Sequence, residues 1–266
     1  MSLLLSYEDL EKNENFTVVE VCFYTDSYID WHIPNAIMLP WRLLRHPIKR
    51  DFASKEGLES GLGSVGISNE DRLVLYSDLN NRYAFYAFWV LKAFGHKELY
   101  VLNGGKTLWE VKGLPKEREM RRRATTKYEA NTPDWSDRVM VWEILKRLKE
   151  ADGFQLLDVR YREEYYGDVG TSPEHPNEES QTTGHIPGAI NVPWNVFFDE
   201  VTEELIPPNR LNLKIEKTDT VVYCRTGARA SLVWFYLKYL LGFPRVRLYD
   251  GSWAEWGNMV GVPVER

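Results

Sequence analysis

Residues 32–41 read HIPNAIMLPW, and residues 185–194 read HIPGAINVPW. Seven of these ten positions are identical. A second pair of segments follows in the same order, without a gap and at an offset of 147 residues: LVLYSDLNNRYAFYAFWVLKAFGHKELYVLNGGKTLW from residue 73, and TVVYCRTGARASLVWFYLKYLLGFPRVRLYDGSWAEW from residue 220. Two matched blocks in the same order indicate an internal duplication. The chain is therefore expected to contain two copies of one domain.

Each copy shows the same alternation of apolar segments. Short β-branched runs predict buried strands, and longer runs of helical period, two of which end at a glycine, predict helices. Alternating strands and helices favour a parallel sheet. The expected fold class is α/β, with two tandem domains that each hold a doubly wound parallel sheet covered by helices on both faces. The predicted strands are 17–21, 73–76, 99–102, 155–159, 220–223 and 245–249, and the predicted helices are 82–94, 139–149 and 229–241.

The boundary between the copies is expected between Trp109 and Val139. Residues 116–127 hold six basic and two acidic residues, which is typical of a solvated linker. Binding of an anionic partner is the alternative interpretation of this segment. The predicted domains are residues 1–115 and 139–266, joined by a linker at 116–138.

Composition excludes several classes of protein. A net charge of −6 argues against a dedicated nucleic-acid binder, and 44% hydrophobic with 27% charged residues is ordinary for a globular protein. No apolar stretch approaches the ~18 residues of a membrane span, and the acidic N-terminus does not resemble a signal peptide, so we expect a cytoplasmic protein. Two cysteines without CxxC spacing and five scattered histidines predict neither a disulfide framework nor a metal site.

Cys224 lies where the second copy differs most informatively from the first. It directly follows the predicted strand 220–223 and precedes a helix, and ligands bind at this edge of parallel sheets. Unpaired N–H groups at the helix start, the helix dipole, and the guanidinium groups of Arg225 and Arg229 all favour a thiolate. Gly227 permits a positive φ. The segment therefore predicts a nucleophilic sulfur in a cradle for a small anion.

The first copy carries a different loop at the same place. Ser77 replaces the cysteine, Asn80 replaces Gly227, and Asp78 stands where the second copy has Arg225. A serine nucleophile would need a general base, and the matched loop contains no histidine. The first domain is therefore expected to be catalytically silent.

These residues resemble the rhodanese family of sulfurtransferases over essentially the whole chain. The resemblance is carried by GHIPGA at residues 184–189, the six-residue loop from Cys224, DGSWAEW at 250–256 and DVR at 158–160. It implies two tandem rhodanese-like domains with an inactive first and an active second domain. This is the arrangement of the thiosulfate/3-mercaptopyruvate sulfurtransferases.

The resemblance also implies a mechanism. Cys224 would accept a sulfane sulfur as a persulfide, backbone N–H groups of residues 225–229 would stabilise the outer sulfur, and no metal or organic cofactor would be needed. The sulfur would pass to cyanide, a small thiol or a thioredoxin-like acceptor. Because two cations suit the dianion, thiosulfate is favoured as donor, with 3-mercaptopyruvate second. Glu164 stands where some two-domain enzymes carry a substrate-binding arginine, so the way in which the sulfonate end is held stays open.

The remaining site residues are assigned by position. Arg160 is expected to support the loop through Asp158, with substrate contact as its alternative role. Trp253 fits the pocket mouth and the core equally well. His185 recurs as His32 in the silent copy, which favours a structural role. The predicted substrate-binding residues are Arg225, Thr226, Gly227, Ala228, Arg229, Arg160 and Trp253, and the predicted loop supports are Asp158, His185 and Asp250.

Two other functions compete with this interpretation. Related folds in phosphatases and arsenate reductases place an arginine six positions after the cysteine, whereas here the sixth position is Ala230 and Arg229 is the fifth. The shorter loop fits a single sulfur better than a phosphate. A non-catalytic sulfur carrier or interaction module is the second alternative, because the first copy shows that the fold can lose its cysteine.

Overall fold

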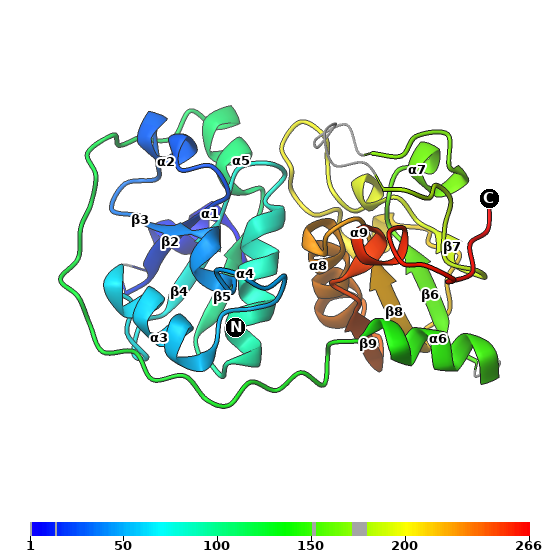
Figure 1. Ribbon diagram of the computed structural model, residues 1–266. Helices are drawn as coiled ribbons and strands as arrows, with labels where there is room; N and C mark the ends of the chain where they lie inside the picture. Colours follow the sequence, from blue (N-terminus) through cyan, green and yellow to red (C-terminus); the bar gives the residue numbers. More distant parts are fainter. Residues whose placement is uncertain (1, 14, 151–152, 172–179) are drawn as a thin grey trace. The chain divides into compact units, whose positions relative to one another are not determined.

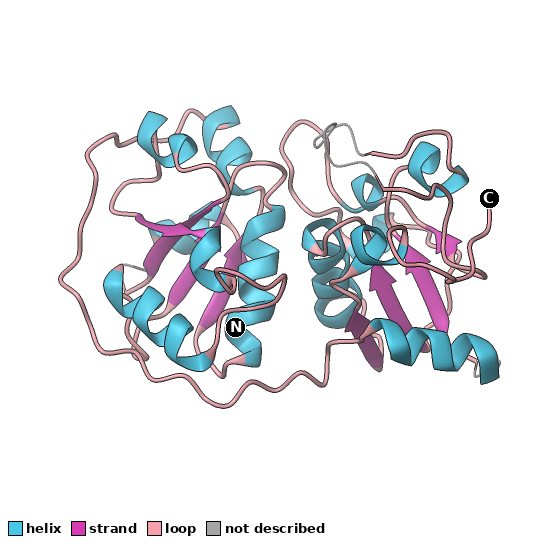
Figure 2. Ribbon diagram, viewed as in Figure 1, coloured by secondary structure: helices cyan, strands magenta, loops and turns pink. Residues whose placement is uncertain are grey.

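The computed structural model describes residues 2–13, 15–150, 153–171 and 180–266. The chain divides into two compact units (Figure 1). Unit 1 comprises residues 1–135 and 199–205, and unit 2 comprises residues 136–198 and 206–266. Each unit contains one sheet in which every pair of neighbouring strands is parallel, with helices packed around it (Figure 2). This is the α/β class that the alternating sequence pattern predicts.

Unit 1 has a five-stranded sheet in the order β1-β5-β4-β2-β3. Its strands are β1 (Leu4–Leu5), β2 (Thr17–Cys22), β3 (Ile37–Pro40), β4 (Leu73–Tyr76) and β5 (Leu99–Leu102). Its helices are α1 (Tyr7–Glu11), α2 (Asp26–Asp30), α3 (Lys55–Ser64), α4 (Arg82–Ala93) and α5 (Gly105–Val111), with a 3-10 turn η1 (Trp41–Leu44).

The sheet of unit 1 is buried on both faces. Val74 and Tyr76 of β4 belong to a core cluster with Tyr28 of α2 and Trp109 of α5. Side chains alternate along a strand, so Leu75 points to the opposite face. There α4 packs against β2, β4 and β5. The helix predicted at 82–94 thus covers one face of the sheet, and ten of its consecutive residues, from 82 to 91, are buried.

Residues 116–135, most of the predicted linker, follow the surface of unit 1. The N–H of Thr126 donates to the carbonyl of Gly63 at 3.0 Å. Arg123 forms an ion pair with Asp71 at 2.9 Å. Backbone and side-chain contacts with distant parts of the unit therefore hold this segment in an extended path, which contains no helix and pairs with a strand-like neighbour only at the isolated antiparallel bridge between Glu117 and His32.

Unit 2 has a four-stranded sheet in the order β7-β6-β8-β9. Its strands are β6 (Gln155–Asp158), β7 (Ile190–Asn191), β8 (Asp219–Tyr223) and β9 (Arg245–Leu248). Its helices are α6 (Val141–Glu150), α7 (Arg162–Tyr166), α8 (Ala228–Phe235) and α9 (Ser252–Trp256), with 3-10 turns η2 (Trp194–Phe197) and η3 (Pro208–Arg210) and a π turn η4 (Tyr236–Leu240).

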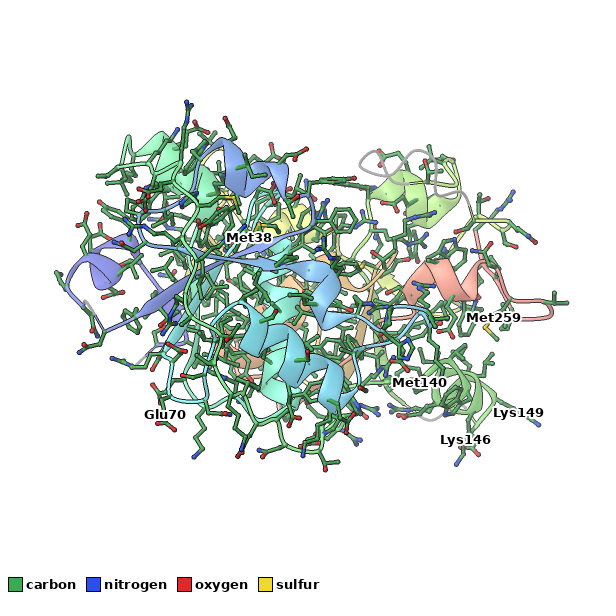
Figure 3. The ribbon with its side chains drawn as sticks, turned by 60° about the vertical axis from the view of Figure 1, so that its left-hand side comes forward. Met38, Glu70, Met140, Lys146, Lys149 and Met259 are labelled. Atoms are coloured by element: carbon green, nitrogen blue, oxygen red, sulfur yellow. The ribbon has the colours of Figure 1, made fainter. Side chains whose placement is uncertain are left out.

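The helix α6 shows how an amphipathic sequence covers the sheet of unit 2. Ile144 is buried in a core cluster with Val221 of β8 and Trp256 of α9. Lys146 and Lys149 are exposed and point away from the helix (Figure 3). The opposite face of the sheet is covered by α8, which packs against β8 and β9. Unit 2 therefore repeats the two-sided burial of unit 1.

The six predicted strands are confirmed, with ends that differ by at most one residue. The helix predicted at 229–241 is wrong in its second half, where the chain forms η4 instead of a continued α-helix. The N–H of Leu241 donates to the carbonyl of Tyr236 at 3.0 Å, a five-residue span. A π turn accommodates an extra residue within a helical run, and apolar periodicity does not report it. No helix in the described ranges is long and apolar enough to cross a membrane.

Candidate active site

Cys224 directly follows β8, at the carboxyl end of the strand, and its residue is only 1% exposed. The helix α8 begins at Ala228, so residues 224–227 form a tight turn between strand and helix. Within this turn the N–H of Gly227 points at the Cys224 Sγ, with an N–Sγ distance of 3.1 Å. The structure thus brings a backbone donor onto the sulfur, in the geometry that stabilises negative charge on it.

Glycine is required at position 227 for two reasons. Its φ is +93°, in the left-handed region that side chains disfavour. A Cβ there would also lie 3.2 Å from the Cα of Asp250. Asp250 is itself held by Arg138, whose Nε donates to its Oδ1 at 2.8 Å. The Arg138–Asp250 ion pair therefore lies against one side of the turn, which is the way in which Asp250 would support it.

The start of α9 fixes the peptide groups of the cysteine loop. The Cys224 N–H donates to the Ser252 Oγ at 3.1 Å, and this hydroxyl donates to the Tyr249 carbonyl at 2.7 Å. The Trp253 N–H donates to the Cys224 carbonyl at 2.9 Å. Cys224 is therefore held through both of its own backbone polar groups, one bonded to the Ser252 side chain and the other to the Trp253 backbone.

Ser252 is a supporting residue that sequence reasoning missed. Its φ is +53°, and Gly105, at the matched position of the first copy, has φ +50°. The duplication contained the signal, because a glycine at position 105 marks a backbone conformation that both copies share. Ser252 keeps this conformation although it has a side chain, and that side chain holds the Cys224 N–H.

The two predicted cations of the loop have partners. Arg229 donates to both carboxylate oxygens of Glu164, with Nη1–Oε2 at 2.7 Å and Nη2–Oε1 at 2.9 Å. Arg225 donates through Nη1 to the carbonyl of Gly170 at 3.0 Å and to the Ser180 Oγ at 3.4 Å. Glu164 therefore offsets the positive charge that the sequence assigned to the end of the loop.

A cavity of about 350 Å³ lies on the Glu164 side of this ion pair. Its lining residues come from the position between Arg160 and α7, from α7 itself and from the loop that follows α7. They are Tyr161, Glu163, Glu164, Val169 and Thr171. Residues 167–183 form a polar segment with no counterpart in the first copy, and it contributes Val169 and Thr171 to the cavity, whereas its residues 172–179 lie outside the described part of the chain.

Arg160 and Asp158 form a buried ion pair behind the loop. The Arg160 Nη2 lies 2.6 Å from the Asp158 Oδ2 and donates to the Gly184 carbonyl at 2.7 Å. Its guanidinium lies 4.4 Å from the ring centroid of Trp253. Arg160 and Trp253 are each 1% exposed. This arrangement favours the expected support role for Arg160, and the core position for Trp253, over substrate contact.

His185 is held in a structural arrangement that unit 1 repeats. Its Nδ1 lies 2.9 Å from the Tyr165 carbonyl, and the two rings stack with centroids 3.7 Å apart. His32 makes the same contacts with Tyr28, at 2.9 Å and 3.8 Å. Because this arrangement occurs equally in the copy without a cysteine, it fixes the turn in which each histidine lies.

The matched turn of unit 1 differs in shape from the cysteine turn. The Ser77 N–H donates to the Asn81 Oδ1 at 2.8 Å. Leu79, Asn80 and Asn81 all have positive φ, whereas Gly227 is the only such residue in the turn of unit 2. Asp78 stands where the second copy carries the cation Arg225, and burial raises the pKa of its carboxyl group. The turn of unit 1 thus lacks both the sulfur and the backbone form of the cradle.

Each unit has a buried carboxylate at the same position of its sheet, but the cation that pairs with it differs. Glu20 pairs with Tyr76 in the sheet register of unit 1, as Asp158 pairs with Tyr223 in unit 2, so Glu20 is the counterpart of Asp158. Its cation is Lys106, whose Nζ lies 3.3 Å from the Glu20 Oε1. Cys22 occupies the place of Arg160. It is buried, and burial raises the pKa of its thiol, which agrees with a structural role for this cysteine.

The fold and the turn at Cys224 define a class of α/β protein with a cysteine at the carboxyl end of a parallel strand, in front of a helix. The Rhodanese-like domain family matches residues 6–112 and 141–259. This chain therefore belongs to the rhodanese family, with one family domain in each unit.

Curated relatives extend the match to nearly the whole chain. A putative thiosulfate sulfurtransferase from Saccharopolyspora erythraea is 40% identical over 273 residues, which cover 99% of this chain and 96% of the relative. The sulfur carrier protein TtuD from Thermus thermophilus is 41% identical over 249 residues, covering 90% of this chain and 87% of TtuD.

Among solved structures, a variant of EanB with a cysteine persulfide, in a tetrahedral intermediate state with ergothioneine, superposes with a TM-score of 0.82. It is 25% identical to this chain. The match covers 95% of this chain and 65% of the EanB chain, so this protein spans about two thirds of EanB.

Proposed function

We propose that this protein is a thiosulfate sulfurtransferase that carries the sulfane sulfur as a persulfide on Cys224. The observation that carries the proposal is the Gly227 N–H on the Cys224 Sγ at 3.1 Å, in a turn at the start of α8. The first N–H groups of a helix have no partner within the helix, and they favour an anion at this position. The names of the relatives support the same class of reaction.

The proposed reaction has two displacement steps. The Cys224 thiolate attacks the outer sulfur of thiosulfate, a new S–S bond forms, and the original S–S bond breaks with release of sulfite. The persulfide then gives its outer sulfur to a thiophilic acceptor. Cyanide yields thiocyanate, a thiol yields its persulfide, and the Cys224 thiolate is restored in either case. Because the enzyme is covalently modified between the two substrates, ping-pong kinetics are expected.

Each predicted site residue has a role in this proposal. The N–H groups of Arg225, Thr226, Gly227, Ala228 and Arg229 stabilise the outer sulfur. Asp158, Arg160, Trp253 and Asp250 hold the turn and the strand ends around it, and His185 fixes a neighbouring turn. The chemistry requires a thiolate and backbone donors.

The experiment is a mass measurement on the whole protein. We expect thiosulfate to add about 32 Da, the mass of one sulfur on a thiolate nucleophile, to the wild type and to Cys22→Ser. Cys224→Ser should show no addition, because an alcohol does not form the persulfide. The Cys22 variant is a matched control, since it removes the other thiol of the chain, which is buried in unit 1.

Each other outcome points to a different function. Addition with 3-mercaptopyruvate alone would change the donor and keep the persulfide. Addition without turnover of cyanide or a small thiol would favour a sulfur carrier. No addition, together with Cys224-dependent hydrolysis of p-nitrophenyl phosphate, would replace the proposal with a phosphatase.

A further inference from the structure

We propose that Glu164 is a specificity-determining residue, which sets the donor preference of the site by engaging the guanidinium of Arg229. This inference rests on the proposed sulfurtransferase function and deepens it. It concerns a residue that stands in the sequence where a substrate-binding cation is expected, and that instead places a carboxylate beside the cysteine loop.

The first observation is the geometry of the contact. Both terminal nitrogens of Arg229 donate to Glu164, at 2.7 and 2.9 Å, and each uses a different carboxylate oxygen. A bidentate pair of this kind fixes the plane as well as the position of the guanidinium. The direction of the Arg229 side chain is therefore set by Glu164.

The second observation is burial. The Arg229 residue is 4% exposed and Glu164 is 1% exposed. A carboxylate at contact distance offsets most of the positive potential that a guanidinium would present to a dianion, and it does so more strongly where water is excluded. Removal of the carboxylate charge would leave a buried cation that favours an anionic ligand.

The third observation is access. The cavity of about 350 Å³ that borders Glu164 is also lined by Tyr161. The guanidinium of Arg229 lies 5.5 Å from the Tyr161 ring centroid. The Glu164 member of the ion pair therefore lines space that a small ligand can occupy, with Arg229 directly behind its carboxylate. A donor near Glu164 meets its negative charge together with the positive charge of Arg229.

The consequence for the reaction is a weakened preference for a doubly charged donor. Thiosulfate carries two negative charges, and methanethiosulfonate delivers a sulfane sulfur with one, leaving as methanesulfinate. With Glu164 in place, the charge of the donor contributes little to its affinity. With Glu164 neutralised, the positive charge of Arg229 that this carboxylate had offset should favour thiosulfate over methanethiosulfonate, chiefly through KM, because the attack by Cys224 itself is unchanged.

The test compares both donors in four proteins with cyanide as acceptor. In Glu164→Gln we expect a roughly tenfold gain in kcat/KM for thiosulfate through a lower KM, at nearly unchanged kcat, and less than a threefold gain for methanethiosulfonate. Asp168→Asn is the matched control, since it removes one negative charge from an exposed position four residues further on. It should change neither donor by more than twofold.

The double variant Glu164→Gln/Arg229→Gln keeps the proposal falsifiable should the single variant fold poorly. It replaces the ion pair with a neutral pair, and we expect its thiosulfate KM to stay within threefold of the wild-type value. A rise of more than tenfold would show that Arg229 itself holds thiosulfate, and would overturn the proposal. An unchanged or higher thiosulfate KM in folded Glu164→Gln, or equal gains for both donors, would also overturn it.

The proposed function fails separately, through the mass measurement on the wild type. If the wild type accepts no sulfur from thiosulfate but Glu164→Gln does, the role of Glu164 stands and the native donor changes. If neither protein accepts sulfur from thiosulfate, both proposals are overturned.

Discussion

The backbone N–H of Gly227 lies 3.1 Å from the sulfur of Cys224, three residues earlier in the chain. This contact exists because the turn between β8 and α8 takes a left-handed conformation at Gly227. It links a single backbone angle to the charge on a single sulfur atom. Substitutions that change this angle are therefore expected to alter the chemistry more than the stability of the fold.

Gly227→Ala tests that link. A left-handed alanine costs about 1–2 kcal/mol, and its Cβ would meet Asp250 at 3.2 Å, so the turn must shift and move the N–H away from the sulfur. We expect persulfide formation from thiosulfate to slow by at least tenfold, as measured by mass spectrometry of reactions quenched at set times. Gly242→Ala is the control, because Gly242 also has positive φ (+64°) but open space around its Cβ position. Equal rates in the two variants would contradict the assignment.

Ser252 offers a test that separates stability from positioning. Ser252→Ala removes the acceptor of the buried Cys224 N–H and should cost about 1–3 kcal/mol of unfolding free energy. Ser252→Gly loses the same hydrogen bond but relieves the strain at φ +53°, so it should be the more stable of the two. Both should slow persulfide formation, as measured beside urea unfolding curves. A fully active Ser252→Ala would show that this anchor is dispensable.

Removing Lys106 from its buried pair with Glu20 is expected to destabilise unit 1 by an amount that depends on pH. Burial raises the pKa of Glu20, and Lys106 opposes this shift. Lys106→Met should cost about 3–5 kcal/mol near pH 7, because it leaves a buried carboxylate without its cation. A carboxyl group whose pKa is raised in the folded protein contributes its full stability below the unfolded-state pKa of about 4.3. This contribution is lost as the pH rises through the folded-state pKa. The deficit relative to wild type should therefore shrink from pH 7 to pH 5, and Glu20→Gln/Lys106→Met should recover most of it. A deficit that is independent of pH would contradict this account.

Ser77→Cys tests whether the turn of unit 1 becomes active when it receives a thiol. We expect no 32-Da addition from thiosulfate in Ser77→Cys/Cys224→Ser, because residues 79–81 are all left-handed and Asp78 replaces a cation. The parent Cys224→Ser protein is the baseline, and free-thiol titration confirms that the new cysteine is present. Sulfur addition at position 77 would show that the cysteine alone limits this domain.

The local pattern of the sequence was sufficient for the fold class and for six of the nine strands in the described residues. Strands such as Thr17–Cys22 form where β-branched residues cluster, and the helix at Arg82 forms where the period becomes helical. Both patterns depend only on residues that are close together in the sequence. Because each duplicated block contains them, the sequence predicts two parallel α/β domains. The π turn at Tyr236–Leu240 escaped prediction, because an extra residue in a helix leaves the apolar pattern almost unchanged.

The sequence by itself determined the family, the duplication, and the place of Cys224 between a strand and a helix. The tertiary structure decided which charges act at that place. Glu164 lies 65 positions from Arg229, and Ser252 lies 28 positions from Cys224, yet each is a direct partner. Short-range patterning does not encode such pairs, since they arise only when separate strand ends and helix starts meet at one edge of the sheet. The charge that a ligand meets beside the cysteine is therefore a property of the packed domain.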